Sequence, residues 1–201
     1  MFKFKFQDHY FKQAKKEWYK ARSAFKLDEI QQKFHLFDKR TKKILDIGCA
    51  PGSRMQYAAN QMKKNKNSDF TIIGFDLKDV NLNLPGVKTY VADITDQEKI
   101  KTILKENNIE KVDLVQSDMA PNTIGMKDID AIRLFELINS MKWILKDILK
   151  PDGKFVIKLF MGPGFEEFIK EMKTEFWGKN IKTLKPHSTR KESKEIYIVK
   201  I

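Results

Sequence analysis

The sequence is poor in the residues that build covalent or metal-based frameworks. It has one cysteine among 201 residues, Cys49, so no disulfide can form within the chain and a reducing compartment is expected. Its three histidines, His9, His35 and His187, are scattered and lack the spacing of zinc ligands. The sequence therefore predicts no metal site.

Long hydrophobic runs are also absent. No segment has the roughly 18 consecutive apolar residues needed to span a bilayer. The N-terminus lacks the unbroken apolar core of a secretory signal, and residues 1–6 are cationic and amphipathic, which supports an organelle-targeting role only weakly. We expect a protein that does not bind membranes.

Positive charge is what the sequence has in excess. It contains 39 Lys and Arg against 27 Asp and Glu, a net charge of +12. Such an excess favours a polyanionic partner such as nucleic acid, although a lysine-rich surface produced by coding bias is the alternative. The hydrophobic fraction of 41% is ordinary for a globular protein, and the length suits one domain.

Helix and strand patterns alternate along the chain. Residues 8–25 carry apolar side chains three and four apart, which predicts an N-terminal helix that docks its apolar stripe on the core and offers a basic face to RNA. Strand patterns follow at 43–47, 70–76, 87–91, from 112, and at 154–160, 181–184 and 195–201. Helical patterns lie between them at 53–62, 96–106, 129–148 and 165–176. This alternation predicts an α/β fold with a mainly parallel sheet.

The loop after the first of these strands is a candidate cofactor site. The segment Asp46-Ile47-Gly48-Cys49-Ala50-Pro51-Gly52 opens a helix, for which Ser53 is the expected cap. Its glycines let a ligand approach the backbone, and the helix N-terminus offers N–H groups. The spacing is not G-x-G-x-x-G, which argues against a nicotinamide-dependent dehydrogenase. A ligand with a small carboxylate and a nucleoside, such as S-adenosylmethionine, suits the loop better.

Two acidic residues extend this candidate site. Asp76 ends the second strand, where a carboxylate can accept hydrogen bonds from both ribose hydroxyls of a nucleoside. Asp93 follows the third strand and can accept a hydrogen bond from an adenine amino group. Each aspartate alone can instead cap a turn or remain solvated. The ordered series of loop, Asp76 and Asp93 favours S-adenosylmethionine.

Two later strands each deliver one charged side chain near the carboxyl end, Asp118 and Lys158. A lysine in an apolar strand is costly to bury without a partner or a task, and ligands bind at this edge of an open parallel sheet. Methyl transfer to a hydroxyl oxygen needs a proton acceptor, and a lysine accepts only when neutral, which a second cation favours. Lys26 can be that cation, and Glu195 can bond Lys26 or a ribose. Either of these two residues, taken alone, can also be surface charge.

Five segments resemble the motifs of the FtsJ/RrmJ-type ribosomal RNA 2′-O-methyltransferase family, in the family's order. They are residues 8–11 with 21–30, then 45–52, 117–122, 155–160 and 193–197. The resemblance covers nearly the whole chain. It implies a Rossmann-like class I methyltransferase fold, with a mainly parallel seven-stranded sheet and helices on both faces. It also implies a single domain, residues 1–201, in which residues 1–30 form a basic helical extension that contributes to RNA binding.

The resemblance assigns roles to individual residues. The family's catalytic Lys-Asp-Lys-Glu tetrad, whose second lysine is the proton acceptor, falls on Lys26, Asp118, Lys158 and Glu195. Contacts to S-adenosylmethionine fall on Gly52, Arg54, Asp76, Asp93 and Asp118. Arg54 departs from the family, whose bacterial members usually have a tryptophan there. Its backbone can still contact the cofactor, but the packing of a ring is lost.

The short length and the segment Gly162-Pro163-Gly164-Phe165 resemble the bacterial large-subunit branch of the family. The implied activity is methylation of a ribose 2′-hydroxyl, on a uridine of large-subunit ribosomal RNA. We expect a monomer whose partner is ribosomal RNA or the large ribosomal subunit. Its location would be cytoplasmic in a bacterium, and the mitochondrion or another organelle in a eukaryote. The alternatives are a tRNA or mRNA-cap 2′-O-methyltransferase, or a non-catalytic RNA-binding ribosome-assembly factor.

Overall fold

A seven-stranded sheet forms the centre of the computed structural model, which describes residues 19–176 and 180–201. Its strand order is β3-β2-β1-β4-β5-β7-β6. The strands are β1 (Lys43–Ile47), β2 (Thr71–Asp76), β3 (Val87–Val91), β4 (Val112–Ser117), β5 (Leu149–Phe160), β6 (Ile181–Leu184) and β7 (Glu195–Lys200). Strands β1 to β5 are parallel, and β7 is antiparallel to both of its neighbours. The predicted mainly parallel α/β sheet is confirmed.

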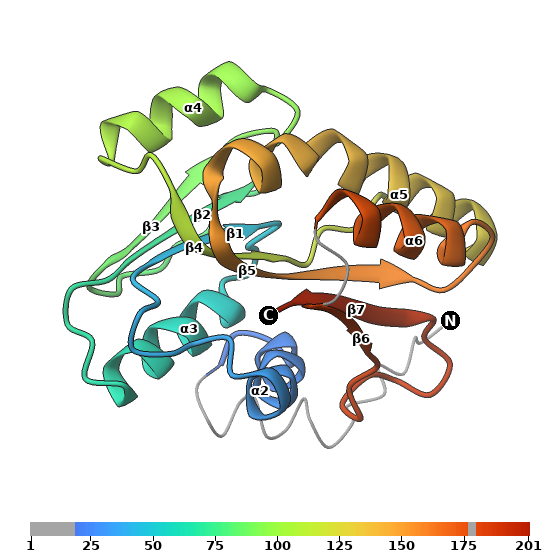
Figure 1. The fold of residues 1–201 in the computed structure, drawn as a ribbon, viewed down its shortest axis with the longest axis horizontal. Helices are drawn as coiled ribbons and strands as arrows, with labels where there is room; N and C mark the ends of the chain where they lie inside the picture. Colours follow the sequence, from blue (N-terminus) through green and yellow to red (C-terminus); the bar gives the residue numbers. More distant parts are fainter. Residues whose placement is uncertain (1–18, 177–179) are drawn as a thin grey trace, which may run out of the picture.

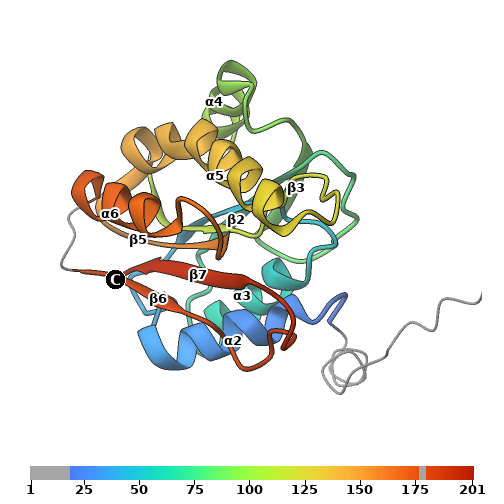
Figure 2. The same ribbon diagram turned by 90° about the vertical axis from the view of Figure 1, so that its right-hand side faces the viewer.

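Helices cover both faces of this sheet (Figure 1). One face is covered by α2 (Ser23–Phe34) and α3 (Ser53–Lys64), and the other by α4 (Gln97–Glu106), α5 (Lys127–Trp143) and α6 (Phe165–Glu175). The view in Figure 2, turned by 90°, shows the same three layers. A π-helical turn, Ile144–Ile148, continues α5 to the start of β5. Parallel strands require this double cover because the crossover helices lie on both faces.

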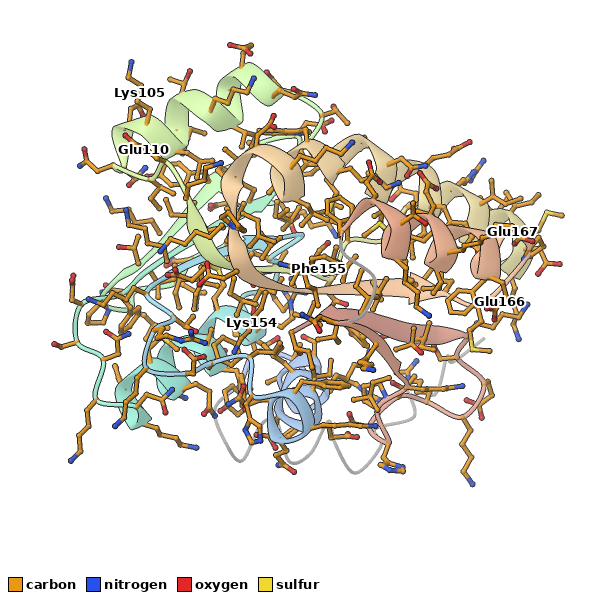
Figure 3. All side chains as sticks on the ribbon, in the orientation of Figure 1. Lys105, Glu110, Lys154, Phe155, Glu166 and Glu167 are labelled. Carbon is orange, nitrogen blue, oxygen red and sulfur yellow. The ribbon has the colours of Figure 1, made fainter. Side chains whose placement is uncertain are left out.

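Side chains of β5 alternate between the two layers, as the period of a strand requires. Phe155 is fully buried in the cluster that includes α5 and α6, whereas Val156 belongs to the cluster on the side of α2 and α3. Lys154, labelled beside Phe155 in Figure 3, bonds the backbone oxygen of His35 just after α2. Lys158, four residues further on, therefore lies on the face covered by α2 and α3.

The predicted N-terminal helix is tested only in part, because residues 1–18 lie outside the described residues. Residues 19–22 form a bend and turn, and α2 begins at Ser23, so the predicted helix end at residue 25 is wrong. The apolar spacing continues past that point: Leu27 and Ile30 are buried against the sheet. Lys26 consequently lies on a helix. The role of residues 1–30 as an RNA-binding extension stays a prediction.

No helix within residues 19–176 and 180–201 combines the length and the apolar character needed to cross a membrane.

Candidate active site

One face of the sheet gathers the charged side chains that the sequence singled out. Val156 and Val199 pack toward α2 and α3. Lys158 and Tyr197 are two residues away on the same strands, and they are paired across β5 and β7, so they share that face. The carboxyl ends of β4 and β5 and the start of β7 meet here, which brings Asp118, Lys158 and Glu195 to one edge.

A continuous chain of contacts joins the four residues of the predicted tetrad. Lys158 Nζ donates to the backbone oxygen of Asp118 at 2.7 Å and lies 3.3 Å from its Oδ1. Lys26 Nζ on α2 donates to Glu195 Oε1 at 2.5 Å. The hydroxyl of Tyr197 connects the two pairs, since it lies 2.7 Å from Glu195 Oε1 and 3.1 Å from Asp118 Oδ1. The structure thus brings all four residues together, and their catalytic roles stay predictions.

Tyr197 is a site residue to which sequence reasoning gave no role. Its ring is buried, and its hydroxyl has one proton to share between two carboxylates. Burial raises the pKa of Tyr197 well above its ordinary value, and the adjacent charges of Asp118 and Glu195 raise it further. Tyr197 is therefore a neutral hydroxyl that bridges the two carboxylates.

Asp118 is ionised at neutral pH. Burial alone would raise its pKa, but nearby cations, led by Lys158 and Arg54, outweigh burial and lower the pKa to about 2. Lys158 is itself buried, with the carboxylate of Asp118 beside its amino group.

The glycine loop between β1 and α3 lies against this cluster. Gly48 has a φ of +70°, and a Cβ there would lie 2.9 Å from the backbone of Met119, the residue after Asp118. Asp118 N–H donates to the carbonyl of Ile47 at 3.1 Å, which fastens the start of the loop to β4. Gly52 has a φ of +103°, and a Cβ would lie 2.5 Å from the side chain of Leu82. Both positions require glycine.

Asp76 braces the other side of the loop. Its Oδ2 accepts the N–H of Ala50 at 2.8 Å, and its Oδ1 accepts the N–H of Lys78 at 2.9 Å. Asp93 is exposed at the end of β3, where its Oδ1 accepts the backbone N–H and the hydroxyl of Thr95, bonds that lower its pKa. Both acids lie at the predicted edge, and both carboxylates also stabilise their own turns.

Arg54 and Ser53, the first residues of α3, differ from expectation. The Arg54 side chain is 5% exposed and turns beneath the loop, where its guanidinium contacts Asp46 Oδ1 and lies 3.1 Å from the carbonyl of Gly48. Gly52, not Ser53, is the cap residue of α3. The hydroxyl of Ser53 instead lies 2.7 Å from that of Ser23, so it ties α3 to the start of α2. The predicted cap is wrong.

A cavity of about 410 Å³ opens beside the tetrad. Its lining is strongly polar and carries both signs of charge, from Arg22, Lys26, Arg190, Glu192, Ser193 and Glu195. Two members of the tetrad therefore face a space into which a polar substrate can enter. Among the described residues, no group of His, Cys, Asp and Glu side chains has the arrangement of a metal site.

Comparison with known proteins identifies the family. Residues 19–201 match the family of FtsJ-like methyltransferases. The chain is 41% identical over 194 residues to the ribosomal RNA large subunit methyltransferase E of Bdellovibrio bacteriovorus, an alignment that covers 96% of this chain and 95% of the relative. It is 40% identical over 195 residues to the protein of the same name in Pelagibacter ubique, covering 96% and 90%.

A solved structure agrees with these sequence relatives. The crystal structure described as a ribosomal RNA methyltransferase of Plasmodium falciparum matches with a TM-score of 0.73 and 32% sequence identity, and the match covers 90% of this chain and 97% of that one. The family predicted from the five sequence motifs is confirmed. The chain belongs to the FtsJ-like methyltransferase family.

Proposed function

We propose that this protein transfers a methyl group from S-adenosylmethionine to a ribose 2′-hydroxyl of large-subunit ribosomal RNA, with a uridine as the expected nucleoside. Family membership supplies the methyltransferase chemistry, and the names of the relatives supply the class of RNA. The observation that carries the proposal is the chain of contacts from Lys26 to Lys158, because methyl transfer to a weakly acidic hydroxyl needs a positioned proton acceptor.

The residues around the glycine loop fit S-adenosylmethionine. Gly48 and Gly52 let the loop backbone pass close to Met119 and Leu82, and the carboxylates of Asp76, at the end of β2, and Asp93, just after β3, lie where they can accept from ribose hydroxyls and an amino group. Asp118 adds an ionised carboxylate, which suits a sulfonium cation. When bound, the cofactor supplies an electrophilic methyl group. Arg54 contributes through its backbone, since its side chain lies beneath the loop.

Lys158 is the residue that we assign as proton acceptor. As a free amine it takes the proton of the attacking hydroxyl, and the ammonium that results is stabilised by Asp118, 3.3 Å away. Glu195 lines the cavity and can accept a hydrogen bond from the incoming ribose while Lys26 holds it in place. The hydroxyl of Tyr197 fixes the carboxylates of Glu195 and Asp118 relative to each other. Orientation of the hydroxyl and removal of its proton are thus divided between the two pairs.

Basic side chains are frequent in the stretch of chain that contributes Arg190 to the lining of this cavity. They lie on β6 and on the segment between β6 and β7: Lys182, Lys185, Arg190, Lys191 and Lys194. We assign them to RNA phosphates, and their contribution should weaken as salt rises because counterions compete with them. A polyanionic partner at this surface also accounts for the net charge of +12. In a bacterium, such a substrate would place the protein in the cytoplasm.

The test is methyl transfer to defined RNAs. The protein is incubated with radiolabelled S-adenosylmethionine and large ribosomal subunits, naked large-subunit rRNA, tRNA or capped mRNA, and the product is mapped by its resistance to alkaline cleavage. We expect one 2′-O-methylated nucleotide in the large-subunit RNA. Label on a base, or faster labelling of tRNA or capped mRNA, would contradict the proposal. Rescue of subunit assembly by a Lys158→Ala protein would favour the non-catalytic assembly factor.

A further inference from the structure

Arg54 is a buried cation at the place where the cofactor loop meets the tetrad. Arginine is almost never fully buried unless it is paired. Here one guanidinium has three acceptors on consecutive residues: a carboxylate oxygen of Asp46, the carbonyl of Ile47 at 3.3 Å and the carbonyl of Gly48 at 3.1 Å. Because Arg54 lies in α3 and its acceptors lie in β1 and the loop, this side chain joins the segments before and after the loop.

The acceptors of Arg54 are themselves fixed. Asp46 is fully buried, and its Oδ2 accepts a hydrogen bond from Gln116 Nε2 in β4 at 2.8 Å. Burial raises the pKa of Asp46 to about 6, against the lowering effect of Arg54 and Gln116. Without Arg54, Asp46 would keep Gln116 as its one hydrogen-bond partner among the described side chains. Arg54 is therefore the counter-charge that lets an acid occupy the base of the loop.

The carbonyl of Ile47 connects Arg54 to the tetrad. It accepts from Arg54 and also from the backbone N–H of Asp118, at 3.1 Å. The backbone oxygen of Asp118 in turn accepts from Lys158 Nζ at 2.7 Å. The path from Arg54 to the amino group of Lys158 thus runs through the carbonyl of Ile47 in β1 and the backbone of Asp118, just after β4, with a hydrogen bond between each residue and the next. A shift of the guanidinium would move Asp118 as well as the loop.

We propose that Arg54 is a positioning residue that sets the cofactor loop and Asp118 in one geometry, so that cofactor affinity and the rate of methyl transfer both depend on it. The inference rests on the proposed function, since it assumes that the loop binds S-adenosylmethionine. In this proposal the side chain of Arg54 supports the loop from beneath, through its contacts with Asp46 and Gly48. All three acceptors surround one nitrogen, Nη2, at the far end of the guanidinium, and the shorter side chain of lysine cannot bring its ammonium to the same point without a shift of the backbone.

The experiment compares Arg54→Met and Arg54→Lys with Lys142→Met, a control that also removes a buried cation. Lys142 contacts Glu171 and Glu175 of α6, on the opposite face of the sheet. S-adenosylmethionine affinity is measured by calorimetry at a temperature where circular dichroism shows every variant folded. Methyl transfer is then measured in a single turnover at saturating cofactor and RNA.

We expect Arg54→Met to weaken cofactor binding by about tenfold or more, the loss that follows from hydrogen bonds to a charged group. Arg54→Lys should recover stability but only part of the affinity and of the single-turnover rate. Lys142→Met should lose stability while it keeps the affinity of the unsubstituted protein. Unchanged affinity and rate in Arg54→Lys and Arg54→Met would overturn the inference. If Arg54→Met does not fold, Arg54→Lys alone decides it. Failure of the unsubstituted protein to bind the cofactor would instead refute the proposed function.

Discussion

Replacement of Tyr197 by phenylalanine isolates the hydroxyl that links the two halves of the tetrad. The ring is buried and would keep its packing, so the loss is limited to contacts at 2.7 Å with Glu195 and 3.1 Å with Asp118. A hydrogen bond to a charged group contributes about 1.5–3 kcal/mol. In the variant, the ion pairs Lys26–Glu195 and Lys158–Asp118 both remain, so neither carboxylate is left without a partner. We therefore expect the lower end of that range.

The expected loss is therefore about 1.5–2 kcal/mol of unfolding free energy, or about 3–8 °C in melting temperature for a chain of this size. If a similar amount is lost from the transition state, single-turnover methyl transfer slows by about tenfold. Tyr57→Phe is the matched control, because the Tyr57 hydroxyl also donates to a carboxylate, Asp28, at 2.8 Å outside the tetrad. It should lose stability and keep activity. Equal activity of Tyr197→Phe and Tyr57→Phe would refute the bridging role.

Three further outcomes are expected. Asp76→Ala should weaken S-adenosylmethionine binding by about tenfold, because it removes the proposed ribose acceptor and the hydrogen bond to the N–H of Ala50. An unchanged dissociation constant by calorimetry would count against this role of Asp76. Lys26→Met should cost about 3 kcal/mol of stability, measured by urea unfolding, because it strands the buried Glu195 carboxylate. The pKa of Asp118 is about 2 in the folded protein against an ordinary 3.8, so its stabilising contribution is complete above pH 3.8 and is lost as pH falls through 2. Unfolding curves of Asp118→Asn should lack this acid limb, and an identical limb in that variant would assign the effect to other groups.

The alternation of strand and helix patterns predicted the α/β class and the mainly parallel sheet, which the structure confirms. The mostly apolar run 43–47 coincides with β1, which is buried over most of its length because helices cover both faces of the sheet. The pattern at 87–91 coincides with β3, an edge strand that is only partly buried. The start of α2 was missed because apolar residues at helical spacing continue from residue 11 through Ile30, and the sequence shows no break in that spacing at Ser23.

The sequence predicted the site residues whose positions follow from the ends of strands. It missed the residue whose position follows from the pairing of one strand with another. Asp118 and Lys158 each follow an apolar run, which places them at one edge whatever the strand order. The bridging position of Tyr197 exists only because β7 runs antiparallel beside β5 and sets it opposite Lys158, and local sequence does not encode that neighbour. The sequence also marked Arg54 as unusual without showing that its side chain turns inward to Asp46.

The most direct test of the account is a single-turnover assay of Lys158→Ala on the RNA substrate, with RNA binding measured in parallel. We predict that methyl transfer falls by about 10²–10⁴-fold, the contribution of a positioned proton acceptor, while RNA affinity is retained because the basic surface is unchanged. Full activity in Lys158→Ala would contradict the assignment of Lys158 and, with it, the reading of the charged cluster as a catalytic centre.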